Sequence, residues 1–353
     1  MSIRYIDGFE DYATADITNG NWNSNIVPVN AAISAGNGRE GSCLRFSGTQ
    51  NRYVTKTFDN QVTWIIGFAF RTGILPDTLQ HGHFITLYDG VTVQASLHLN
   101  IDGTLQVCNG QVTVVTGGQS VSTLSINTWY YIEFKVTIAD SIGAGTCKVR
   151  VNGVDWITVA TGQDLKAGTN AFANAIGIGP FASGSSGWST NIDFDDLYIA
   201  DGVAGAVSGD NDFLGDVRVE SLFPTGAGTT TNWTPDSGSN YARVNEVAPD
   251  TTSYVASSTV NNIDTYAMGN LSSTPLKIWA VQSGLVCRKM DAGSRSVAPV
   301  VRGADGDKIG ATISVYDSYF NQQQVYEQNP LTSPADWTET SVNGIEMGFK
   351  LIA

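Results

Sequence analysis

The sequence is short of charge, and of positive charge above all. Charged residues make up 15% of its 353 residues, against about 25% in an average soluble protein. Residues 1–205 hold 10 Lys or Arg against 17 Asp or Glu, and residues 206–353 hold 9 against 16, so each part carries a net charge of −7. Such surfaces repel phosphate backbones and anionic membranes, so we expect neither nucleic acid nor a membrane as a partner.

Long apolar runs and helical periodicity are also missing. No stretch approaches the ~20 apolar residues of a membrane span, and residues 1–7 lack the apolar stretch of a secretory signal. We therefore expect a chain made in the cytoplasm. Apolar residues alternate with polar ones instead, as in residues 64–70 and 130–138. This period of two predicts an all-β protein built from antiparallel sheets.

Turn dipeptides punctuate the first two hundred residues. Asn152-Gly153 tolerates the positive φ angles of a type I′ hairpin, and Asp89-Gly90 and Asp102-Gly103 separate other strand-like runs. In the order of these strands, and in the segments around Phe9-Glu10 and residues 194–198, the first region resembles concanavalin A-like and laminin-G-like proteins. The resemblance implies a jelly-roll β-sandwich over residues 1–202, with neighbouring terminal strands.

A run of small residues, 203–209, predicts a linker before a second domain at residues 210–353. Strand-like runs indicate a second β-sandwich-like domain, and a short helix is expected at residues 334–339 or just after them. The expected strands are residues 241–246, 278–281, 285–289, 297–302, 310–316 and 345–351. Pro299 needs an edge or a bulge, because it has no N–H for a β-ladder.

The second region carries a chain of motifs that begins with Phe213-Leu214-Gly215-Asp216-Val217-Arg218-Val219. Residues 232–235 (Asn-Trp-Thr-Pro) and 291–299 (Asp-Ala-Gly-Ser-Arg-Ser-Val-Ala-Pro) follow in order. In these segments the region resembles a β module of tailed-bacteriophage virion proteins. In those proteins the β module follows a concanavalin A/laminin-G-like domain. The resemblance implies a virion structural protein.

The carboxylates offer two functional alternatives to a plain β-strand. Glycoside hydrolysis usually needs two carboxylates beside the scissile bond, and the first domain lacks such a set apart from Asp193 with Asp195, so we expect no enzyme. The same two residues with Asp201 form a candidate Ca²⁺ site, since Ca²⁺ prefers oxygen ligands. We favour the simpler interpretation, in which Asp193 and Asp195 line the solvated face of a terminal strand, and expect no cofactor other than this Ca²⁺.

Aromatic and cysteine residues complete the candidate sites. Trp188, Tyr88 and Trp22 lie in or beside polar, loop-like sequence, and their rings are candidates for stacking on sugars. The four cysteines, Cys43, Cys108, Cys147 and Cys287, form no Cys-x-x-Cys pair. They are either buried free thiols or partners in disulfides, and their spacing does not decide between the two.

Together these observations predict a non-enzymatic structural protein of a phage virion. It would decorate the neck or collar, the tail or the head surface as a homo-oligomer in contact with other virion proteins. The alternative is a carbohydrate-binding adhesin or tail fibre that recognises a host surface glycan. Coiled-coil heptads are missing from the sequence, which argues against a long helical shaft.

Overall fold

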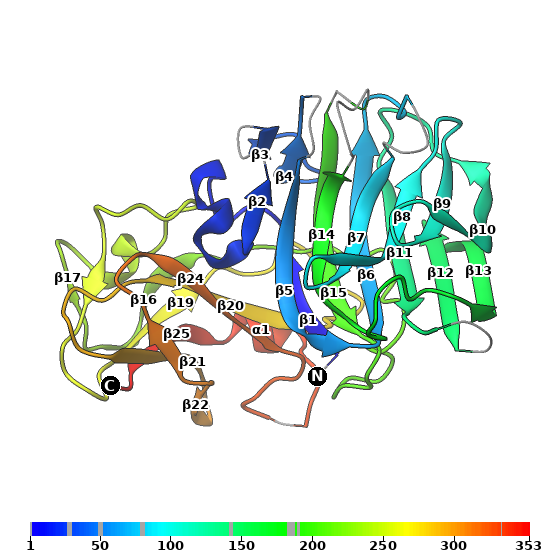
Figure 1. Cartoon of the computed structure of the whole chain (residues 1–353). Helices are drawn as coiled ribbons and strands as arrows, with labels where there is room; N and C mark the ends of the chain where they lie inside the picture. Colours follow the sequence, from blue (N-terminus) through cyan, green and yellow to red (C-terminus); the bar gives the residue numbers. More distant parts are fainter. Residues whose placement is uncertain are drawn as a thin grey trace. The chain divides into compact units, whose positions relative to one another are not determined.

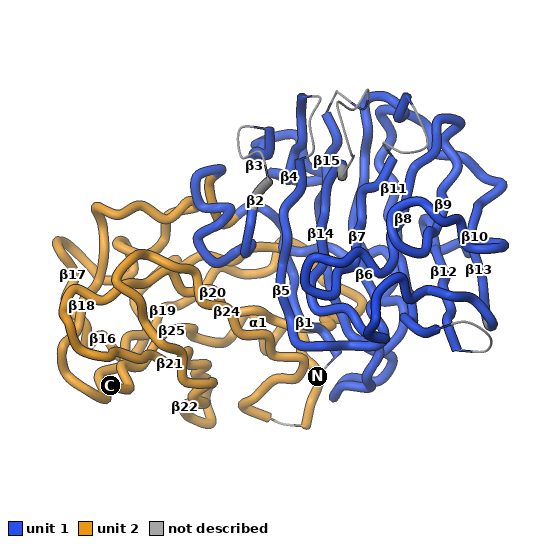
Figure 2. Tube along the Cα trace, viewed as in Figure 1, with its two compact units in different colours: residues 1–10, 14–219 blue, residues 11–13, 220–353 orange. Residues whose placement is uncertain are grey.

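The structure is a computed structural model, and it divides the chain into two compact units (Figure 2). Unit 1 comprises Met1–Glu10 and Thr14–Val219, and unit 2 comprises Asp11–Ala13 and Glu220–Ala353. Residues 203–219, which the sequence analysis assigned to a linker and to the second domain, thus group with unit 1. The structure describes residues 2–26, 30–48, 52–77, 82–140, 144–181, 188, 191–332 and 334–353, with the backbone alone for residues 25, 26, 161 and 181.

Unit 1 contains an eight-stranded antiparallel sheet, in the order β13-β12-β11-β6-β15-β4-β3, with β1 also paired to β15 (Figure 1). The first and last strands of the unit are therefore neighbours, as the sequence predicted. The strands are β1 (Ile3–Asp7), β3 (Ala31–Ala35), β4 (Ser42–Phe46), β6 (Thr63–Thr72), β11 (Tyr130–Thr137), β12 (Gly145–Val151), β13 (Val154–Gln163) and β15 (Ile192–Asp201).

The second sheet of unit 1 has seven strands, in the order β10-β9-β8-β7-β14-β5-β2. Two short helical turns, η1 (Thr14–Asp16) and η2 (Ile17–Asn21), precede its first strand. The strands are β2 (Ser24–Ile26), β5 (Tyr53–Gln61), β7 (His83–Asp89), β8 (Thr92–Leu99), β9 (Thr104–Asn109), β10 (Thr113–Thr123) and β14 (Ala173–Phe181).

Aromatic rings join the two sheets of unit 1 into a sandwich. Phe84 of β7 stacks on Phe70 of β6 at 4.7 Å between ring centroids and meets Phe68 edge-to-face at 6.0 Å. Phe194 of β15 lies 5.5 Å from Phe68. Each such pair contributes about 0.5–1.5 kcal/mol beyond the area it buries. The alternation of apolar residues along β6, read from the sequence, places these rings on one face.

The predicted Asn152-Gly153 hairpin is present between β12 and β13. Both residues have positive φ angles, 48° for Asn152 and 78° for Gly153, as a type I′ turn requires. The strand-like runs 64–70 and 130–138 form the neighbours β6 and β11, with Phe68 opposite Ile132. The prediction of an all-β antiparallel fold is therefore confirmed.

Unit 2 is built on a six-stranded sheet, in the order β16-β19-β25-β21-β22, with β23 also paired to β21. Two-stranded pairs β17-β18 and β20-β24 accompany it. The elements are β16 (Pro224–Thr231), β17 (Thr234–Pro235), η5 (Asn240–Arg243), β18 (Val255–Ala256), β19 (Ile263–Met268), β20 (Val281–Cys287), β21 (Arg295–Gly303), β22 (Gly306–Ile309), β23 (Ile313–Val315), β24 (Phe320–Tyr326), α1 (Glu339–Asn343) and β25 (Glu346–Leu351).

The sequence predictions for unit 2 are confirmed in part. Helix α1 begins after Thr338, whose side chain accepts a hydrogen bond from the N–H of Ser341, so the helix lies just after residues 334–339. The expected strand at 241–246 is wrong, because η5 forms there, and β16, β19 and β24 were not expected. Pro299 lies in β21 at the gap between β22 and β23, where no partner needs its missing N–H.

The core of unit 2 consists of small clusters. One gathers around Trp337 with Val301, Tyr326, Val342 and Ile345, and another joins Val297, Val315 and Leu351. Among the described residues of the whole chain, no helix is long and apolar enough to cross a membrane.

Candidate functional site: a strap on buried carboxylates

Residues 210–219, here called the strap, form no helix and no strand. They contain the motif Phe213-Leu214-Gly215-Asp216-Val217-Arg218-Val219 and end where unit 2 begins, at Glu220. The strap belongs to unit 1 and is fixed to its eight-stranded sheet by side chains of β11, β12 and β15. It is therefore the last segment of unit 1 before the chain enters the main part of unit 2 at Glu220.

Backbone N–H groups of the strap donate to buried side chains of the sheet. The N–H of Gly215 donates to Oε1 of Glu133 on β11 at 2.8 Å, and the N–H of Leu214 donates to the hydroxyl of Tyr198 on β15 at 3.2 Å. That hydroxyl in turn donates to Glu133 at 2.7 Å. Glu133 and Tyr198 are both buried. Burial raises the pKa of Glu133 above its ordinary value, and the hydrogen bonds from Tyr198 and Gly215 oppose that rise.

A glycine of the sheet makes room for this arrangement. A Cβ atom on Gly67 of β6 would overlap the ring of Tyr198. Glycine costs stability in a strand because it loses more backbone freedom on folding than other residues. Here it allows the Tyr198 ring to lie across β6, next to Glu133.

Charged side chains hold the end of the strap. Arg218 pairs with Oδ2 of Asp196 at 3.1 Å, and the N–H of Val219 donates to Oδ1 of the same residue at 2.9 Å. Arg39 bridges Asp196, at 3.3 Å, and Asp216 of the strap, at 2.8 Å. A single buried carboxylate on β15 thus collects contacts from both ends of the four-residue run 216–219.

The ring of Phe213 anchors the front of the strap. It is nearly buried and lies under Arg150 of β12, whose guanidinium carbon is 4.6 Å from the ring centroid. Lys148 of the same strand lies 5.8 Å from the centroid. Cations over an aromatic face contribute about 0.5–1 kcal/mol at exposed sites and more when desolvated.

A cluster of carboxyl groups lies beside the end of the strap. Burial, together with the nearby Asp195, Asp7 and Asp196, raises the pKa of Glu10 to about 9. Oε2 of Glu10 is buried and has no hydrogen-bond partner among the residues that the structure describes. Burial and Asp196 raise the pKa of Asp195 to about 7, although it accepts hydrogen bonds from the N–H groups of Arg39 and Asp196. The cluster therefore holds protons at neutral pH that exposed carboxylates would have lost.

Backbone strain coincides with this cluster. Phe9 has a φ of 63° and Asp196 a φ of 50°, both in the left-handed region that residues other than glycine rarely adopt. Each costs on the order of 1–2 kcal/mol. The N–H of Phe9 donates to Asp7 at 2.8 Å, and Asp196 is held by its two arginines. The surrounding contacts therefore impose conformations that the local chain disfavours.

The three aspartates of the candidate Ca²⁺ site have separate partners. Asp193 pairs with Arg45 and Arg71, each at 2.7 Å, and Asp201 pairs with Arg4 at 2.8 Å. All three, including Asp195, are buried, so the favoured interpretation of a solvated strand face is wrong. The physical reason is that side chains and loops cover the face on which these carboxylates lie: Arg45 and Arg71 pair with Asp193, Arg4 pairs with Asp201, and the N–H of Arg39 donates to Asp195. Within the described ranges, no group of three or more His, Cys, Asp or Glu is placed to hold a metal ion.

The candidate sugar-binding rings are also buried. Trp188 has no exposed surface, and its indole N–H donates to Oγ1 of Thr72 at 2.9 Å and to the carbonyl of Ile74 at 3.0 Å. Trp22 is equally buried against Tyr5, and Tyr88 stacks on Tyr53 with 7% of its surface exposed. The prediction that these rings are open to a ligand is therefore wrong. The residues next to them in the sequence are polar, but the rings themselves lie in the core. Residues 182–187, 189 and 190 of the Trp188 loop lie outside the described residues.

The four cysteines are free thiols in this structure, which joins none of them to another within the chain. A disulfide between subunits stays a prediction. Cys43, Cys108 and Cys147 are buried and Cys287 is half-buried. Burial raises the pKa of Cys147 to about 12 and that of Cys287 to about 11. Thiolate is the reactive form of cysteine, so these groups are chemically quiet.

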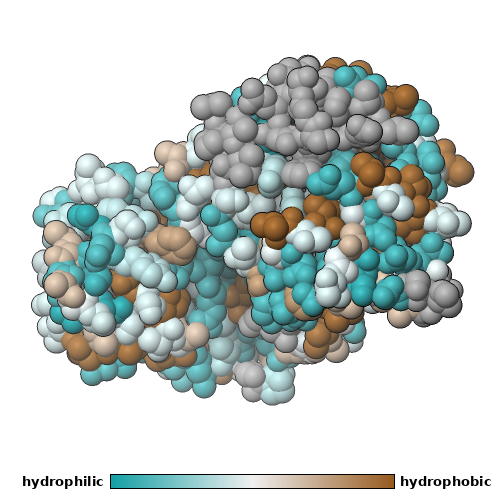
Figure 3. Space-filling model, in the orientation of Figure 1, coloured by the Kyte–Doolittle hydropathy of each residue, from teal (hydrophilic) through white to brown (hydrophobic). Residues whose placement is uncertain are grey.

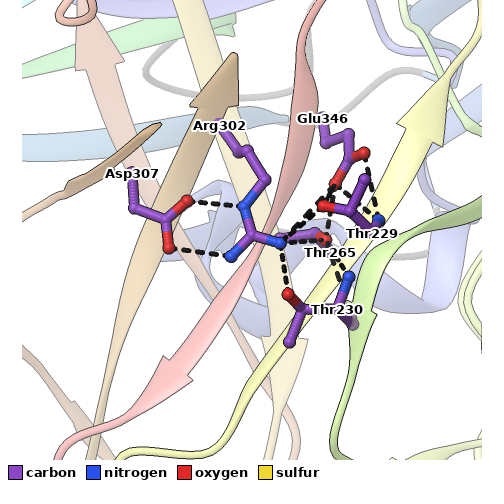
Figure 4. A network of polar contacts seen from close by, with 6 residues as sticks. All are labelled: Thr229, Thr230, Thr265, Arg302, Asp307 and Glu346. Carbon is purple, nitrogen blue, oxygen red and sulfur yellow. Dashed lines mark hydrogen bonds and ion pairs between the residues drawn. The ribbon is translucent and has the colours of Figure 1, made fainter. Parts of the chain in front are cut away.

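Unit 2 contains a polar network of its own, which crosses the six-stranded sheet (Figure 4). Arg302 of β21 makes a two-point bond with Asp307 of β22, at 2.5 and 2.8 Å, and its other nitrogen donates to Oγ1 of Thr229 on β16 at 2.7 Å. Glu346 of β25 accepts from the N–H of Thr229 at 2.9 Å and from Oγ1 of Thr265 on β19 at 2.7 Å. The network joins β22, β21, β25, β19 and β16, so it fixes the order and register of the sheet.

No family model and no curated protein matches the chain. Solved structures do, at low similarity. The alginate lyase Aly36B is 13% identical with a TM-score of 0.39, over 54% of this chain and 91% of that one. A mutant of it in complex with alginate trisaccharide is 13% identical with a TM-score of 0.41, over 57% and 98%. Trypanosoma rangeli sialidase in complex with sialic acid is 13% identical with a TM-score of 0.32, over 45% and 25%.

These likenesses concern the β fold alone. They nevertheless correct one expectation from the sequence, that the chain is not an enzyme. The solved structures it is similar to are a lyase and a sialidase, so the exclusion of enzymes is withdrawn.

Proposed function

We propose that the chain is a structural component of a tailed-phage particle. It would be made in the host cytoplasm and assembled on the neck or collar, the tail or the head surface, as a homo-oligomer in contact with other virion proteins. The observation that carries the proposal is the strap. Residues 213–219 of the strap resemble virion proteins, and their polar contacts with Glu133, Tyr198, Asp196 and Arg39 hold the end of unit 1 to its sandwich.

The polar groups of unit 2 support the same role. Arg302, Asp307 and Glu346 bind one another or the threonines of neighbouring strands, and Asp264 accepts from the side chains of Asn240 and Tyr266. These links tie neighbouring strands together, which supports a rigid structural role.

Exposed apolar side chains provide candidate contacts with neighbours. In unit 2, Leu276 is fully exposed, Met290 is 80% exposed and Tyr316 is 52% exposed. On the face in Figure 3, hydrophobic side chains lie scattered among hydrophilic ones. Single exposed apolar residues are ordinary on a soluble protein. The contacts of the strap are therefore the stronger support for a structural role.

Quantitative mass spectrometry of purified particles tests the proposal. Particles washed at high salt should retain this chain at a fixed ratio to the major capsid protein, and a map of the particle should show density for both units. Loss of the chain in the wash would contradict the assignment.

The alternative is a carbohydrate-binding protein that recognises a host glycan. The burial of Trp188 and Trp22 removes the rings first named for it. A glycan array decides between the two roles, because saturable binding to one host glycan would favour recognition, and binding to none would leave the structural role.

A further inference from the structure

We propose that the strap is a proton-controlled latch. It stays on the eight-stranded sheet of unit 1 while the carboxyl group of Glu10 carries a proton, and it leaves the sheet when that proton is lost. This inference concerns unit 1 alone and does not depend on where the protein is assembled.

The carboxyl group of Glu10 is packed close to the last residue of the strap. A Cβ atom placed on Gly8 would lie 2.9 Å from the carbonyl oxygen of Val219 and 3.1 Å from its Cγ1, and it would also overlap Oε2 of Glu10. The Glu10 carboxyl and the end of the strap therefore both pack against Gly8. Asp196, which accepts from the N–H of Val219, is also one of the charges that raise the pKa of Glu10, so the carboxyl of Glu10 and the end of the strap share a neighbour.

The same carboxyl group faces a surplus of negative charge. The two arginines nearby are already engaged, because Arg39 bridges Asp196 and Asp216 and Arg218 pairs with Asp196. The charges that act on Glu10 are those of Asp195 and Asp196 on β15 and of Asp7 at the end of β1. Arg39 in the loop before β4 and Arg218 in the strap pair with Asp196. A further negative charge here repels the three aspartates, while Arg39 and Arg218 already have carboxylate partners.

The two protons of the cluster are lost in a range that solution experiments reach. Burial holds the pKa of Asp195 at about 7 and that of Glu10 at about 9. The negative charge of Asp195 is one cause of the raised pKa of Glu10, so the loss of the proton from Asp195 makes the loss of the proton from Glu10 harder. Asp196, which holds Val219 and Arg218, is the next residue to Asp195, and its own N–H donates to Asp195 at 2.8 Å.

Release of the strap would change the reach of the chain. Residues 202–219 lie between the end of β15 and the start of unit 2. When extended, these 18 residues span up to about 60 Å. The sandwich itself does not depend on the strap for its strand pairing, so its core strands remain folded when the strap leaves.

Hydrogen exchange of the full chain, read by mass spectrometry between pH 6 and pH 10 and corrected for the chemical exchange rate, tests the latch. In the unmodified protein, exchange of the strap amides should rise at least tenfold between pH 7 and pH 9.5, while peptides from β6 and β15 stay protected. In E10Q the strap should remain protected throughout. The matched control E40Q removes an exposed glutamate a few residues before β4 and should behave as the unmodified protein.

Three results would overturn the latch. They are strap protection that does not change with pH, an E10Q strap that opens as the unmodified one does, and exchange of β6 and β15 in step with the strap. If E10Q does not fold, Asp195→Asn takes its place, since it removes one repelling charge. Its strap should open less at pH 9.5 than that of the unmodified protein, and equal opening would count against the proposal.

Discussion

Val219 and Asp196 stand 23 residues apart, and the backbone N–H of Val219 donates to Oδ1 of Asp196 at 2.9 Å. Asp196 also pairs with Arg39 and Arg218, so one buried side chain joins β15, the loop before β4 and the strap. This makes Asp196 the residue on which the attachment of the strap depends most.

Replacing Asp196 with alanine should therefore destabilise unit 1. We expect a loss of about 2–4 kcal/mol, because the change leaves Arg218 and the N–H of Val219 without their acceptor, takes from Arg39 one of its two carboxylates and places alanine at a positive φ. Asp196→Asn keeps an acceptor oxygen and a side chain that tolerates this φ, so it should cost less. Urea unfolding of the two variants checks the order, and equal losses would show that the hydrogen bond and the backbone conformation contribute little.

The stability of unit 1 should fall as the pH rises. The folded-state pKa of Glu10, about 9, lies above its ordinary value of 4.5, so the folded state binds a proton that the unfolded state releases. The stabilisation is complete below about pH 4.5 and is lost as the pH rises through about 9, with a slope of at most about 1.4 kcal/mol per pH unit for one proton. Melting temperatures of the unmodified protein and of E10Q between pH 5 and pH 10 measure this pH-dependent stabilisation. If the melting temperatures of the two proteins change with pH in parallel, the raised pKa of Glu10 is contradicted.

Trp188 should behave as a core residue. Trp188→Ala is expected to destabilise unit 1 by about 3–5 kcal/mol through the cavity it leaves. Trp188→Phe keeps most of the volume but loses the indole N–H that donates to Thr72 and Ile74, and should cost about 1–2 kcal/mol. Trp279→Ala, at a half-buried ring beside Lys277, is the control and should cost less than Trp188→Ala. Thermal unfolding gives the ranking, and a Trp188→Ala protein as stable as the control would contradict the burial.

The Arg302 network should stabilise unit 2 by a measurable amount. Arg302→Met removes the bonds to Asp307 and Thr229 and should cost about 1–2 kcal/mol, since the pair is only partly buried. Arg302→Lys keeps the positive charge but not the bidentate hydrogen bonds to Asp307, so it should lose part of this stabilisation. The control is Lys308→Gln, at an exposed position of β22. If all three variants unfold at the same temperature, the network contributes no stability.

The thiols should be intact and slow to react. Alkylation in guanidinium should modify all four cysteines without prior reduction, because none is in a disulfide. Under native conditions Cys287 should react before Cys43, Cys108 and Cys147, since it is the only one of the four with more than marginal exposure. Intact-mass measurement follows both reactions. A thiol that appears only after reductant is added would disprove the free state.

Much of unit 1 could be predicted from the sequence because its signals are local. Alternation in residues 64–70 sets the face of β6, and Asn152-Gly153 sets a turn that few other residue pairs allow. The terminal pairing of β1 and β15 followed from the resemblance. In unit 2 the strands were harder to find, because β16 (Pro224–Thr231) is built from glycine, threonine and alanine, which carry no clear apolar alternation.

The candidate site could not be predicted, because its parts are far apart in the sequence. Glu10 and Asp196 come near one another only when β1 pairs with β15, and Glu133 reaches the strap from β11. Nothing in their local sequence marks these residues. Asp193 and Asp195 show period two, which favours a solvated face, yet both faces of an inner strand are covered here. The burial of Trp188 was not predicted, because its sequence neighbours are small and polar and indicate an exposed loop. The ring nevertheless lies in the core.

Gly67 and Tyr198 also limit how chains of this kind can diverge. The ring occupies the space that any side chain at position 67 would need, so the two positions have to change together. A smaller residue at position 198 would permit a larger one at position 67, but Glu133 and Leu214 would then lose the hydroxyl between them. Related sequences that keep the strap should therefore keep this glycine and this tyrosine as a pair.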